Sequence, residues 1–383
     1  MELIDILIIG GGPAGISTAL HLVQSDPHIA PRILVLEKDH YPRDKLCGGG
    51  LVIDAEILLD NLGLDVSEVP CVKADSIHLD FKGKGPKFTN PRGHALRIIR
   101  RDEFDAWLAT RAREKGITIR EGVRVRDLSL DDDLAIVQTD QGEFHAQVVI
   151  GADGSNGTTR RSIFPNTPGS RARVLEVITP GTDQSASRHS DTEAFFDFLP
   201  VPHGIAGYVW DFPTQVGGLP MRCWGIYDAN LFPGKHRPPL KEILYTEMGN
   251  HGFDPSTLKL EGHPILWFTP DNCFSSRRVL LVGDAAGVDP LFGEGISFAL
   301  GYGKIAADAI IAAFKDQRFD FKSYKRRVLR SPLGRALTAR WLVANFIYSF
   351  RWTWFQLFLW RVLKPINIVV AWLFLLNWGK RMK

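Results

Sequence analysis

Four short motifs, far apart in the chain, carry residue types that suit the binding of a dinucleotide. In chain order they are the glycine-rich turn at residues 10–15, Glu37, the segment 151–154 and the pair Gly283-Asp284. In the first motif Gly10 permits a tight turn, Gly12 lets a pyrophosphate approach the backbone, and Gly15 lets the following helix pack on the preceding strand. A glycine turn alone is a weak signal, but the four motifs in this order predict a pocket that holds FAD from end to end.

Apolar segments place the first two motifs at the ends of buried strands. Residues 4–9 are almost all apolar and β-branched, as in a strand buried on both faces of a parallel sheet. The helix expected after the turn begins at Pro13 and Ala14, and its free N–H groups would face the phosphates. The strand at 33–36 ends at Glu37, whose carboxylate can accept hydrogen bonds from both ribose hydroxyls and would repel a 2′-phosphate. The alternative for Glu37 is a solvated strand end.

The other two motifs follow further apolar strands. Residues 146–150 lead into 151–154, and residues 279–282 lead into Gly283-Asp284. Asp284 can bond a ribityl hydroxyl, and Asp153 is expected to hold its own loop near the phosphates. Gly295 and Ile296 open a helix whose N-terminus can hold negative charge at the pyrimidine end of the flavin. Such stabilisation would favour the reduced, anionic flavin.

Over residues 1–330 this pattern resembles the FAD-dependent family that holds the geranylgeranyl reductases, beside the aromatic hydroxylases and the flavin halogenases. Three further segments match elements of that family, at residues 41–49, 101–105 and 208–213. The resemblance implies that Lys45, Cys47 and Gly48 lie near the flavin and that Arg101 lies along the cofactor. If the side chains of Lys45 and Cys47 converge, the ammonium group would lower the pKa of the thiol.

The segment 208–213 matches the Tyr-x-Trp-x-Phe-Pro element that implies a substrate cavity in the reductases. On a strand, Tyr208, Trp210 and Phe212 would face the same side. Such a stripe is also typical of plain core packing, and Cys47 has a similar alternative as a small buried hydrophobe. The expected catalytic residues are Cys47, Tyr208 and Trp210, and Phe292 joins the aromatic residues that would contact the substrate.

The expected cofactor residues come from the four motifs and from the resemblance. They are Gly10, Gly12, Pro13, Ala14, Gly15, Glu37, Lys38, Lys45, Cys47, Gly48, Arg101, Val125, Asp153, Gly154, Gly283, Asp284, Pro290, Gly293, Gly295 and Ile296. Val125 belongs to an expected strand that carries its backbone past the adenine. No residues have metal-ligand spacing, so no metal site is expected.

Two departures from the family pattern bear on the substrate. The reductases carry a Gly-x-Gly several residues after the aromatic element, and Tyr227 stands here in place of the second glycine. Residues 293–295 are Gly-Glu-Gly, where archaeal members often show three glycines. A bulkier residue in the first place would reshape the cavity.

Composition and patterning predict the fold class. The chain has 383 residues, of which 45% are hydrophobic, enough for a large core in two lobes. We expect an α/β protein with a discontinuous Rossmann-like FAD-binding domain (1–70, 95–170 and 273–330), an antiparallel-sheet substrate domain (71–94 and 171–272) and a C-terminal helical region (331–383). The four cysteines show no disulfide framework, which favours a reducing compartment such as the cytoplasm.

The C-terminal region differs from the rest of the chain in charge and aromatic content. Residues 321–383 hold thirteen Lys or Arg and no Asp or Glu, so they carry +13 while residues 1–320 carry −10. Six of the ten tryptophans lie there, and the uncharged run 365–379 has 15 residues, short of the about 20 that span a bilayer. These features predict helices in the surface of an anionic membrane. The alternatives are a helical cap, a partner surface and a spanning segment.

The chemistry expected from these features is the reduction of C=C bonds in an isoprenoid chain. Reduced flavin would deliver a hydride while an acid or water supplies the proton. The resemblance implies a hydrophobic polyprenyl substrate, such as geranylgeranyl diphosphate, its chlorophyll-linked ester or an archaeal-type ether lipid. The electron donor is open between NAD(P)H, ferredoxin and a quinol. The enzyme would lie peripherally on the cytoplasmic face of a membrane, and nucleic acid is not expected as a partner.

Three other functions remain open at this point. An FAD-dependent monooxygenase or halogenase acting on a hydrophobic substrate shares the fold, although the Trp-x-Trp-x-Ile-Pro element expected of a halogenase is not found in the sequence. A flavoprotein that passes electrons to membrane quinone usually adds an iron–sulfur module, for which the cysteines are too dispersed. A flavin-binding protein without catalysis is the third alternative.

Overall fold

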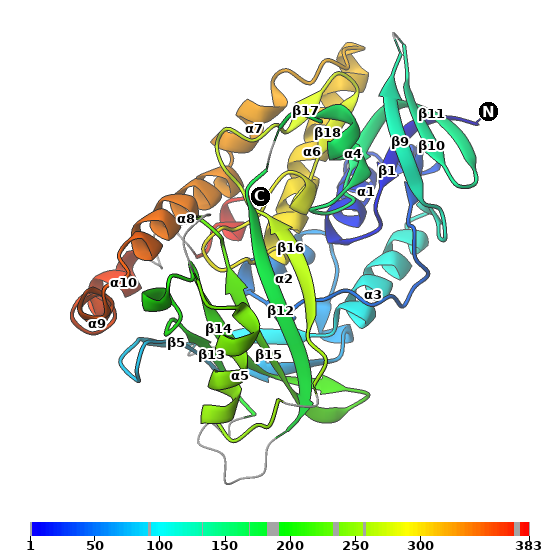
Figure 1. Cartoon of the computed structure of the whole chain (residues 1–383). Helices are drawn as coiled ribbons and strands as arrows, with labels where there is room; N and C mark the ends of the chain where they lie inside the picture. The colour runs from blue at the N-terminus through cyan, green and yellow to red at the C-terminus, as the bar shows by residue number, and fades with distance from the viewer. Residues whose placement is uncertain are drawn as a thin grey trace.

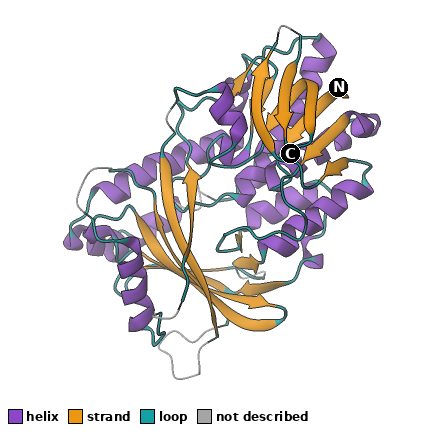
Figure 2. Ribbon diagram, turned by 45° about the vertical axis from the view of Figure 1, so that its right-hand side comes forward, coloured by secondary structure: helices purple, strands orange, loops and turns teal. Residues whose placement is uncertain are grey.

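A computed structural model describes residues 2–90, 93–131, 133–167, 169–181, 191–232, 237–255, 258–370 and 376–382 of the chain. Two large sheets dominate it, one at the end that holds the N-terminus and one at the opposite end, with helices packed around them (Figures 1 and 2). The first sheet has eight strands and the second has seven.

The eight-stranded sheet contains the strands expected to carry the cofactor motifs. Its main path runs β17 (Ser275–Ser276), β18 (Val279–Leu281), β11 (Gly142–Gly151), β1 (Glu2–Ile9), β2 (Ile33–Leu36) and β8 (Thr118–Arg120). β9 (Val125–Leu130) and β10 (Ala135–Thr139) extend it from β11 as an antiparallel pair. β1 is central and pairs in parallel with β2 and β11. Ile6, Leu7 and Ile8 are fully buried, because a central parallel strand is covered on both faces.

Two long helices pack beside this sheet and against each other. α1 (Pro13–Ser25) follows the glycine turn, and α6 (Ile296–Asp316) follows the loop after β18. They touch closely at Gly303, where an added Cβ would lie 2.3 Å from the Ser17 hydroxyl oxygen. The same face of the sheet is flanked by α2 (Ile53–Asn61) and α3 (Arg101–Glu114), and α4 (Thr158–Ile163) lies against β9. Backbone proximity between α1 and α6 therefore brings the first and fourth motifs together.

The seven-stranded sheet forms the second lobe. Its order is β16 (Glu261–Leu266), β12 (Arg171–Pro180), β15 (Leu219–Asp228), β14 (Gly207–Val216), β13 (Glu193–Asp197), β5 (Ser76–Asp80) and β6 (Lys87–Thr89). The expected antiparallel arrangement holds for every pairing along this order except β13 with β5, which is parallel. Strands so far apart in the sequence are not joined by a hairpin, so their relative direction is not restricted to antiparallel. α5 (Leu240–Asn250) covers this sheet at β15.

The α/β fold class, with an FAD-type lobe, a second sheet and C-terminal helices, agrees with the prediction. A small sheet of β3 (Gly50–Leu51), β7 (Leu96–Ile99) and β4 (Cys71–Ala74) joins strands from segments expected in different lobes. The domain limits therefore stay a prediction. The polar composition of residues 179–190 predicts a surface loop; residues 179–180 instead end β12, and 182–190 lie outside the described residues.

The C-terminal region, as far as it is described, is a chain of helices along one edge of the molecule (Figure 1). They are α7 (Tyr324–Arg330), α8 (Pro332–Ser349), α9 (Thr353–Leu357), a π-helical segment (Phe358–Val362) and α10 (Lys364–Val370). α8 begins after Ser331, whose side-chain oxygen accepts a hydrogen bond from the Gly334 N–H at 3.1 Å.

The tryptophans of this region do not all lie at the surface. Trp352 and Trp354 are exposed, whereas Trp360 and Trp378 are buried. Trp378 stacks in parallel on Phe298 of α6 with the ring centroids 4.9 Å apart, and the N–H of Gly379 donates to Asp54. Trp372 lies outside the described residues. The end of the chain thus returns to the first lobe, and part of the aromatic content serves as core.

Candidate active site

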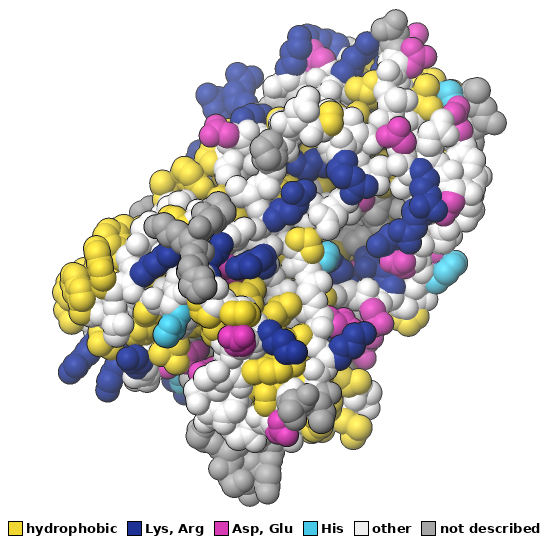
Figure 3. All heavy atoms as spheres, in the orientation of Figure 1, with side chains coloured by type: hydrophobic (Ala, Val, Ile, Leu, Met, Phe, Trp, Pro, Cys, Tyr) yellow, Lys and Arg dark blue, Asp and Glu magenta, His cyan; other side chains and the backbone are white. Residues whose placement is uncertain are grey.

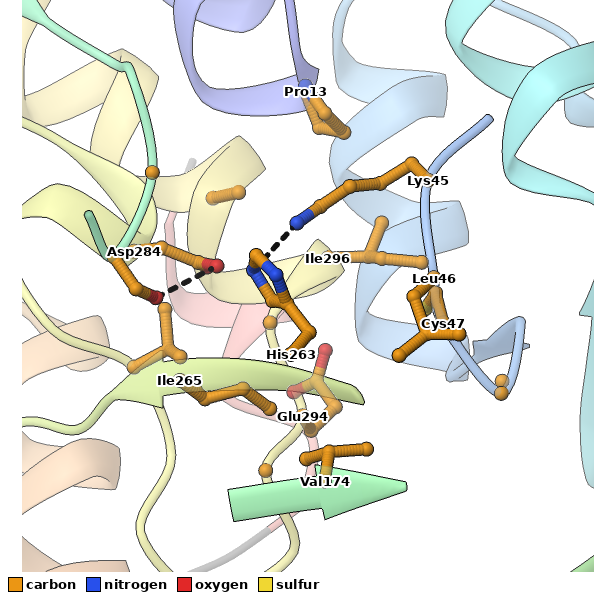
Figure 4. A pocket seen from close by; sticks show the side chains of 18 of the residues that line it. Pro13, Lys45, Leu46, Cys47, Val174, His263, Ile265, Asp284, Glu294 and Ile296 are labelled. Carbon is orange, nitrogen blue, oxygen red and sulfur yellow. Dashed lines mark hydrogen bonds between the residues drawn. The ribbon is translucent and has the colours of Figure 1, made fainter. Parts of the chain in front are cut away.

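A cavity of about 820 Å³ lies between the two lobes and contains residues from all four motifs. This volume is at the upper end of the range typical of cofactor and ligand pockets, about 300–1,000 Å³. Figure 4 shows side chains from the glycine turn, from the segment around Cys47, from β12 and β16, and from the loop before α6 around it. Its lining includes the glycine turn at one end and apolar residues of β14 and the C-terminal helices.

The glycine turn leaves an open anion site at the start of α1. The helix has no side-chain cap at Gly12 and no acidic residue in its first turn, so its first N–H groups are available for phosphate. A Cβ added to Gly12 would meet only the Arg43 guanidinium, at 3.5 Å. Gly15 does not line the cavity, and its added Cβ would lie 2.0 Å from the Gly10 carbonyl oxygen. The last glycine is therefore needed for packing rather than contact, as expected.

Glu37 is buried at the end of β2, with 4% of its surface exposed. Its carboxylate accepts hydrogen bonds from the N–H of Gly11 at 2.9 Å and of Asp39 at 3.1 Å. These contacts fix the carboxylate beside the glycine turn, where unused lone pairs can accept ribose hydroxyls. Because Glu37 is buried, the alternative that it is a solvated strand end is wrong. Lys38 also lines the cavity.

Asp153 holds its own loop, as expected. Its Oδ2 accepts hydrogen bonds from the N–H of Thr159 at 2.8 Å and from the Thr159 hydroxyl at 3.0 Å. Its Oδ1 is buried with no partner within the described chain. Burial raises the pKa of this carboxyl against the opposing effect of the Thr159 bonds. The loop, with Gly154 and with Val125 opposite, forms one wall of the cavity and suits the phosphate side of FAD.

A cluster of charged groups lies in the middle of the cavity (Figure 4). Lys45 Nζ lies 2.7 Å from Nε2 of His263, which the sequence did not single out. Burial lowers the pKa of Lys45 and, with the help of the neighbouring Lys45 charge, lowers that of His263 to about 4. His263 is therefore neutral near pH 7. Asp284 lines the same region, as expected for a ribityl contact.

Cys47 lines the cavity but is not activated. Burial raises the pKa of its thiol, although the Arg101 charge opposes this effect. Arg101 itself is held by a bidentate contact with Asp105, at 2.8 Å from each carboxylate oxygen. The pKa of the thiol is not lowered below its ordinary value, because desolvation outweighs the nearby positive charge of Arg101. Cys47 is thus a neutral thiol at the wall of the site.

The three aromatic residues of β14 face the same side and line the cavity, as the alternation predicts. Trp210 Nε1 lies 3.5 Å from Cys223 Sγ, and its ring packs over Gly225, where an added Cβ would lie 2.0 Å away. Gly48 adjoins the same ring, with 3.1 Å from an added Cβ to the indole nitrogen. Phe212 is the third residue of this stripe, and its ring centroid lies 4.9 Å from that of Phe196.

The hydroxyl groups near this stripe are already in use. Tyr208 donates its hydroxyl to the Phe292 carbonyl at 2.5 Å, and Tyr227 donates to the Pro290 carbonyl at 3.0 Å. Tyr348 of α8 donates to the carbonyl between them, that of Leu291, at 2.7 Å. Three buried tyrosines thus hold three consecutive carbonyls of one loop. Tyr208 lines the cavity and holds the loop through its hydrogen bond to Phe292. Burial raises the pKa of Tyr208 far above the ordinary value.

The loop before α6 carries further expected residues. Gly293, Gly295, Ile296 and Phe292 line the cavity, whereas Pro290 and Gly283 do not. One N–H in the first turn of α6, that of Ser297, is already in use, because Glu294 accepts it at 2.8 Å. The carboxyl of this non-glycine residue thus occupies the first turn of the helix.

Among the cavity residues that the sequence did not predict, four carry groups of chemical interest: His263, Glu294, Arg340 and Trp360. Two of them, His263 and Trp360, carry no local pattern that marks a site. Arg340 is one of the thirteen basic residues from which membrane contact is predicted, yet only 3% of its side chain is exposed. Glu294 was marked only as a departure from three glycines. The predicted site residues all line one cavity, except for Gly15, Gly283 and Pro290, which are not part of its lining.

The lining fits FAD on structural grounds. Four features lie along one cavity: the uncapped start of α1, the open space at Gly12, the buried carboxylate of Glu37 and the Asp153 oxygen without a partner in the described chain. These groups match the successive polar parts of the cofactor. They would hold its adenosine and phosphates at the first lobe and leave the apolar wall of β14 for the flavin and substrate.

Comparison with known proteins agrees with this assignment. An uncharacterized protein of Methanosarcina barkeri is 30% identical over 91% of this chain and 85% of its own length. The geranylgeranyl diphosphate reductase of Rhodobacter capsulatus is 26% identical over 81% of this chain and 76% of its own length. A menaquinone reductase of Mycolicibacterium smegmatis is 25% identical, covering 79% and 75%.

Solved structures share the fold. A geranylgeranyl bacteriochlorophyll reductase-like protein from Thermoplasma acidophilum aligns with a TM-score of 0.79 at 19% identity, covering 99% of this chain and 98% of the other. The halogenase PltM aligns with a TM-score of 0.70 at 16% identity, covering 96% and 82%. The FAD binding domain family matches residues 3–320. The chain therefore belongs to the FAD-dependent oxidoreductases with this domain, in the family that includes the geranylgeranyl reductases.

Proposed function

We propose that this chain is a reductase that hydrogenates C=C bonds of an isoprenoid, geranylgeranyl-type chain. Bound FAD supplies the hydride when reduced. The protein's own part is to hold the alkene, exclude water and provide a proton. Relatives named as geranylgeranyl reductases at 25–26% identity support this class of substrate.

The apolar arm of the cavity is the observation that carries the proposal. It continues from Tyr208, Trp210 and Phe212 to Phe196 and Phe292. Beyond them it is lined by residues of the C-terminal helices, namely Val343, Ile347, Trp360 and Val370. A prenyl double bond has no carbonyl to polarise, so its reduction depends on positioning. A cavity wall of aromatic and aliphatic side chains suits a flexible hydrocarbon chain.

The test is an anaerobic turnover. The purified flavoprotein is photoreduced, geranylgeranyl diphosphate or a geranylgeranylated lipid is added, and flavin absorbance is followed with product mass. We expect reoxidation and products heavier by two hydrogens for each bond reduced. A flavin that stays reduced until air enters, and then yields an oxygenated or halogenated product, would assign the chain to the monooxygenases or halogenases instead.

We also propose that the C-terminal helices bind the surface of an anionic membrane. Ten large apolar side chains of this region are at least one-third exposed: Leu342, Phe346, Trp352, Trp354, Phe358, Val362, Ile366, Ile368, Val369 and Leu376. Figure 3 shows hydrophobic side chains gathered at the end of the molecule where α9 and α10 lie in Figure 1. Several exposed Lys and Arg lie on and around α7. This pairing of apolar and basic surface is typical of an interfacial helix.

Insertion as a spanning helix has less support. Among the described residues, the helix long and apolar enough to cross a membrane is α6, and 78% of its most apolar window is buried inside the protein. It is a core helix of the first lobe. Most of the exposed apolar side chains lie on shorter helical segments, and these segments also contribute residues to the cavity lining. A lipid substrate would thus reach the cavity from the membrane surface.

Co-sedimentation with vesicles tests the membrane proposal. We expect binding to phosphatidylglycerol-containing vesicles that weakens with salt, and loss of binding in the double variant Trp354→Asp, Ile366→Asp. The matched control is Leu219→Asp, because Leu219 is equally apolar and 68% exposed but lies on the hairpin between β14 and β15. Equal binding by the double variant and the control would reject the surface.

A further inference from the structure

Glu294 is a carboxyl that lines the same cavity as the aromatic wall, by which we mean the side chains of Tyr208, Trp210, Phe212 and Phe292. It belongs to the loop that also carries Phe292, and it points into the cavity in Figure 4. Its Oε1 accepts the N–H of Ser297 at 2.8 Å, and its Oε2 lies 2.7 Å from the Ser297 hydroxyl. These two contacts hold the carboxyl in place at the start of α6, with 10% of the side chain exposed.

Glu294 shares its nearest cation, Arg340, with Asp289. Arg340 of α8 lies 3.9 Å from its Oε2 but 2.5 Å from the carboxylate of Asp289 on the same loop, so Asp289 takes most of the neutralisation. Tyr208 of β14 is near enough for the Glu294 charge to act on its hydroxyl. Burial raises the pKa of Glu294 to about 7, while Arg340 and the Ser297 contacts oppose that rise and Asp289 adds to it. The group can therefore hold or release a proton near neutral pH.

The other proton carriers at the aromatic wall are less suited to release a proton. The hydroxyls of Tyr208 and Tyr227 donate to carbonyls of the loop, and burial raises the pKa of both. The thiol of Cys47 also has a raised pKa. A donor works best when its pKa lies near the working pH, which favours Glu294 over these three.

We propose that Glu294 is the acid that protonates the alkene in the proposed reduction, an inference that rests on the proposed function. As the C=C π bond breaks, one carbon gains the hydride and the other takes the proton of the Glu294 carboxyl. The alkene is reduced, the flavin is oxidised, and Glu294 is left as a carboxylate that regains a proton from solvent. Arg340, whose main partner is Asp289, adds a weaker stabilisation of this carboxylate.

The decisive variant is Glu294→Gln, which keeps the size of the side chain and an oxygen for the Ser297 N–H. The matched control is Glu176→Gln. Glu176 is also buried and burial raises its pKa to about 7, but it is absent from the cavity lining. The first readout needs no turnover: the infrared carboxyl band of the FAD-bound protein is titrated with pH. Because the pKa values of Glu176 and Glu294 are both about 7, we expect the wild type to lose two protonated-carboxyl components around that pH. Each variant should lack one of the two components.

The second readout is the single turnover described above, at pH 6 and at pH 8. We expect Glu294→Gln to bind FAD normally and to be reoxidised by substrate about 10²- to 10⁴-fold more slowly than wild type. The wild-type rate should fall as pH rises above about 7, because the proton is then lost. Normal turnover by Glu294→Gln, or an infrared titration in which Glu294→Gln keeps both components, would overturn the role of Glu294 and leave the reductase proposal standing. No reoxidation of any protein by substrate would overturn both.

Discussion

Arg340→Met is expected to destabilise the protein strongly, because it breaks a buried ion pair between the C-terminal region and the loop before α6. The guanidinium Nη1 lies 2.5 Å from Asp289 Oδ2, and the two side chains are 3% and 0% exposed. Asp289 keeps its contacts with the N–H groups of Leu291 and Phe292 but loses its cation. Removing one partner of a buried pair costs about 3–5 kcal/mol, a large fraction of the net stability of a domain.

Urea unfolding followed by tryptophan fluorescence measures this cost. FAD is kept at one concentration, since a bound cofactor adds stability by mass action. The control is Arg335→Met on the same helix, which is exposed and should change the free energy of unfolding by no more than about 0.5 kcal/mol. The double variant Arg340→Met, Asp289→Asn should recover part of the loss, because Asp289 then no longer leaves its charge buried without its cation. Equal stabilities of the Arg340 and Arg335 variants would refute the reasoning.

Three further outcomes follow from the same structure. Glu37→Gln should weaken FAD binding about 10- to 150-fold, the equivalent of a charged hydrogen bond of about 1.5–3 kcal/mol; an unchanged dissociation constant in a flavin-fluorescence titration would place the ribose elsewhere. Gly225→Ala puts a Cβ 2.0 Å from the Trp210 ring and should cost about 1–3 kcal/mol in denaturant unfolding, whereas Gly249→Ala, with open space around it, should not. In Arg340→Met, loss of the cation should raise the Glu294 pKa above about 7, so the fall of the single-turnover rate should move to higher pH; a fall at the wild-type pH would contradict this coupling.

Local patterns in the sequence were sufficient for the cofactor lobe. A strand buried on both faces, followed by a glycine turn and a helix, is set by steric rules that act over a few residues. The strand expected at 4–9 is found as Glu2–Ile9, and the helix expected after the glycine turn is found as Pro13–Ser25. The shared face of Tyr208 and Trp210 follows from the twofold period of a strand. The direction of β5 against β13 does not, because it depends on how distant segments return to one sheet.

The amino-acid sequence alone determined where backbone turns, strands and the uncapped start of α1 lie, because those depend on neighbouring residue types. Only the tertiary structure decided which charges meet. Arg340 and Glu294 are far apart in the chain, and Lys45 meets His263 across 218 residues. Burial and those meetings set the pKa values of Glu294, His263 and Cys47, since desolvation and Coulomb forces act through space rather than along the chain.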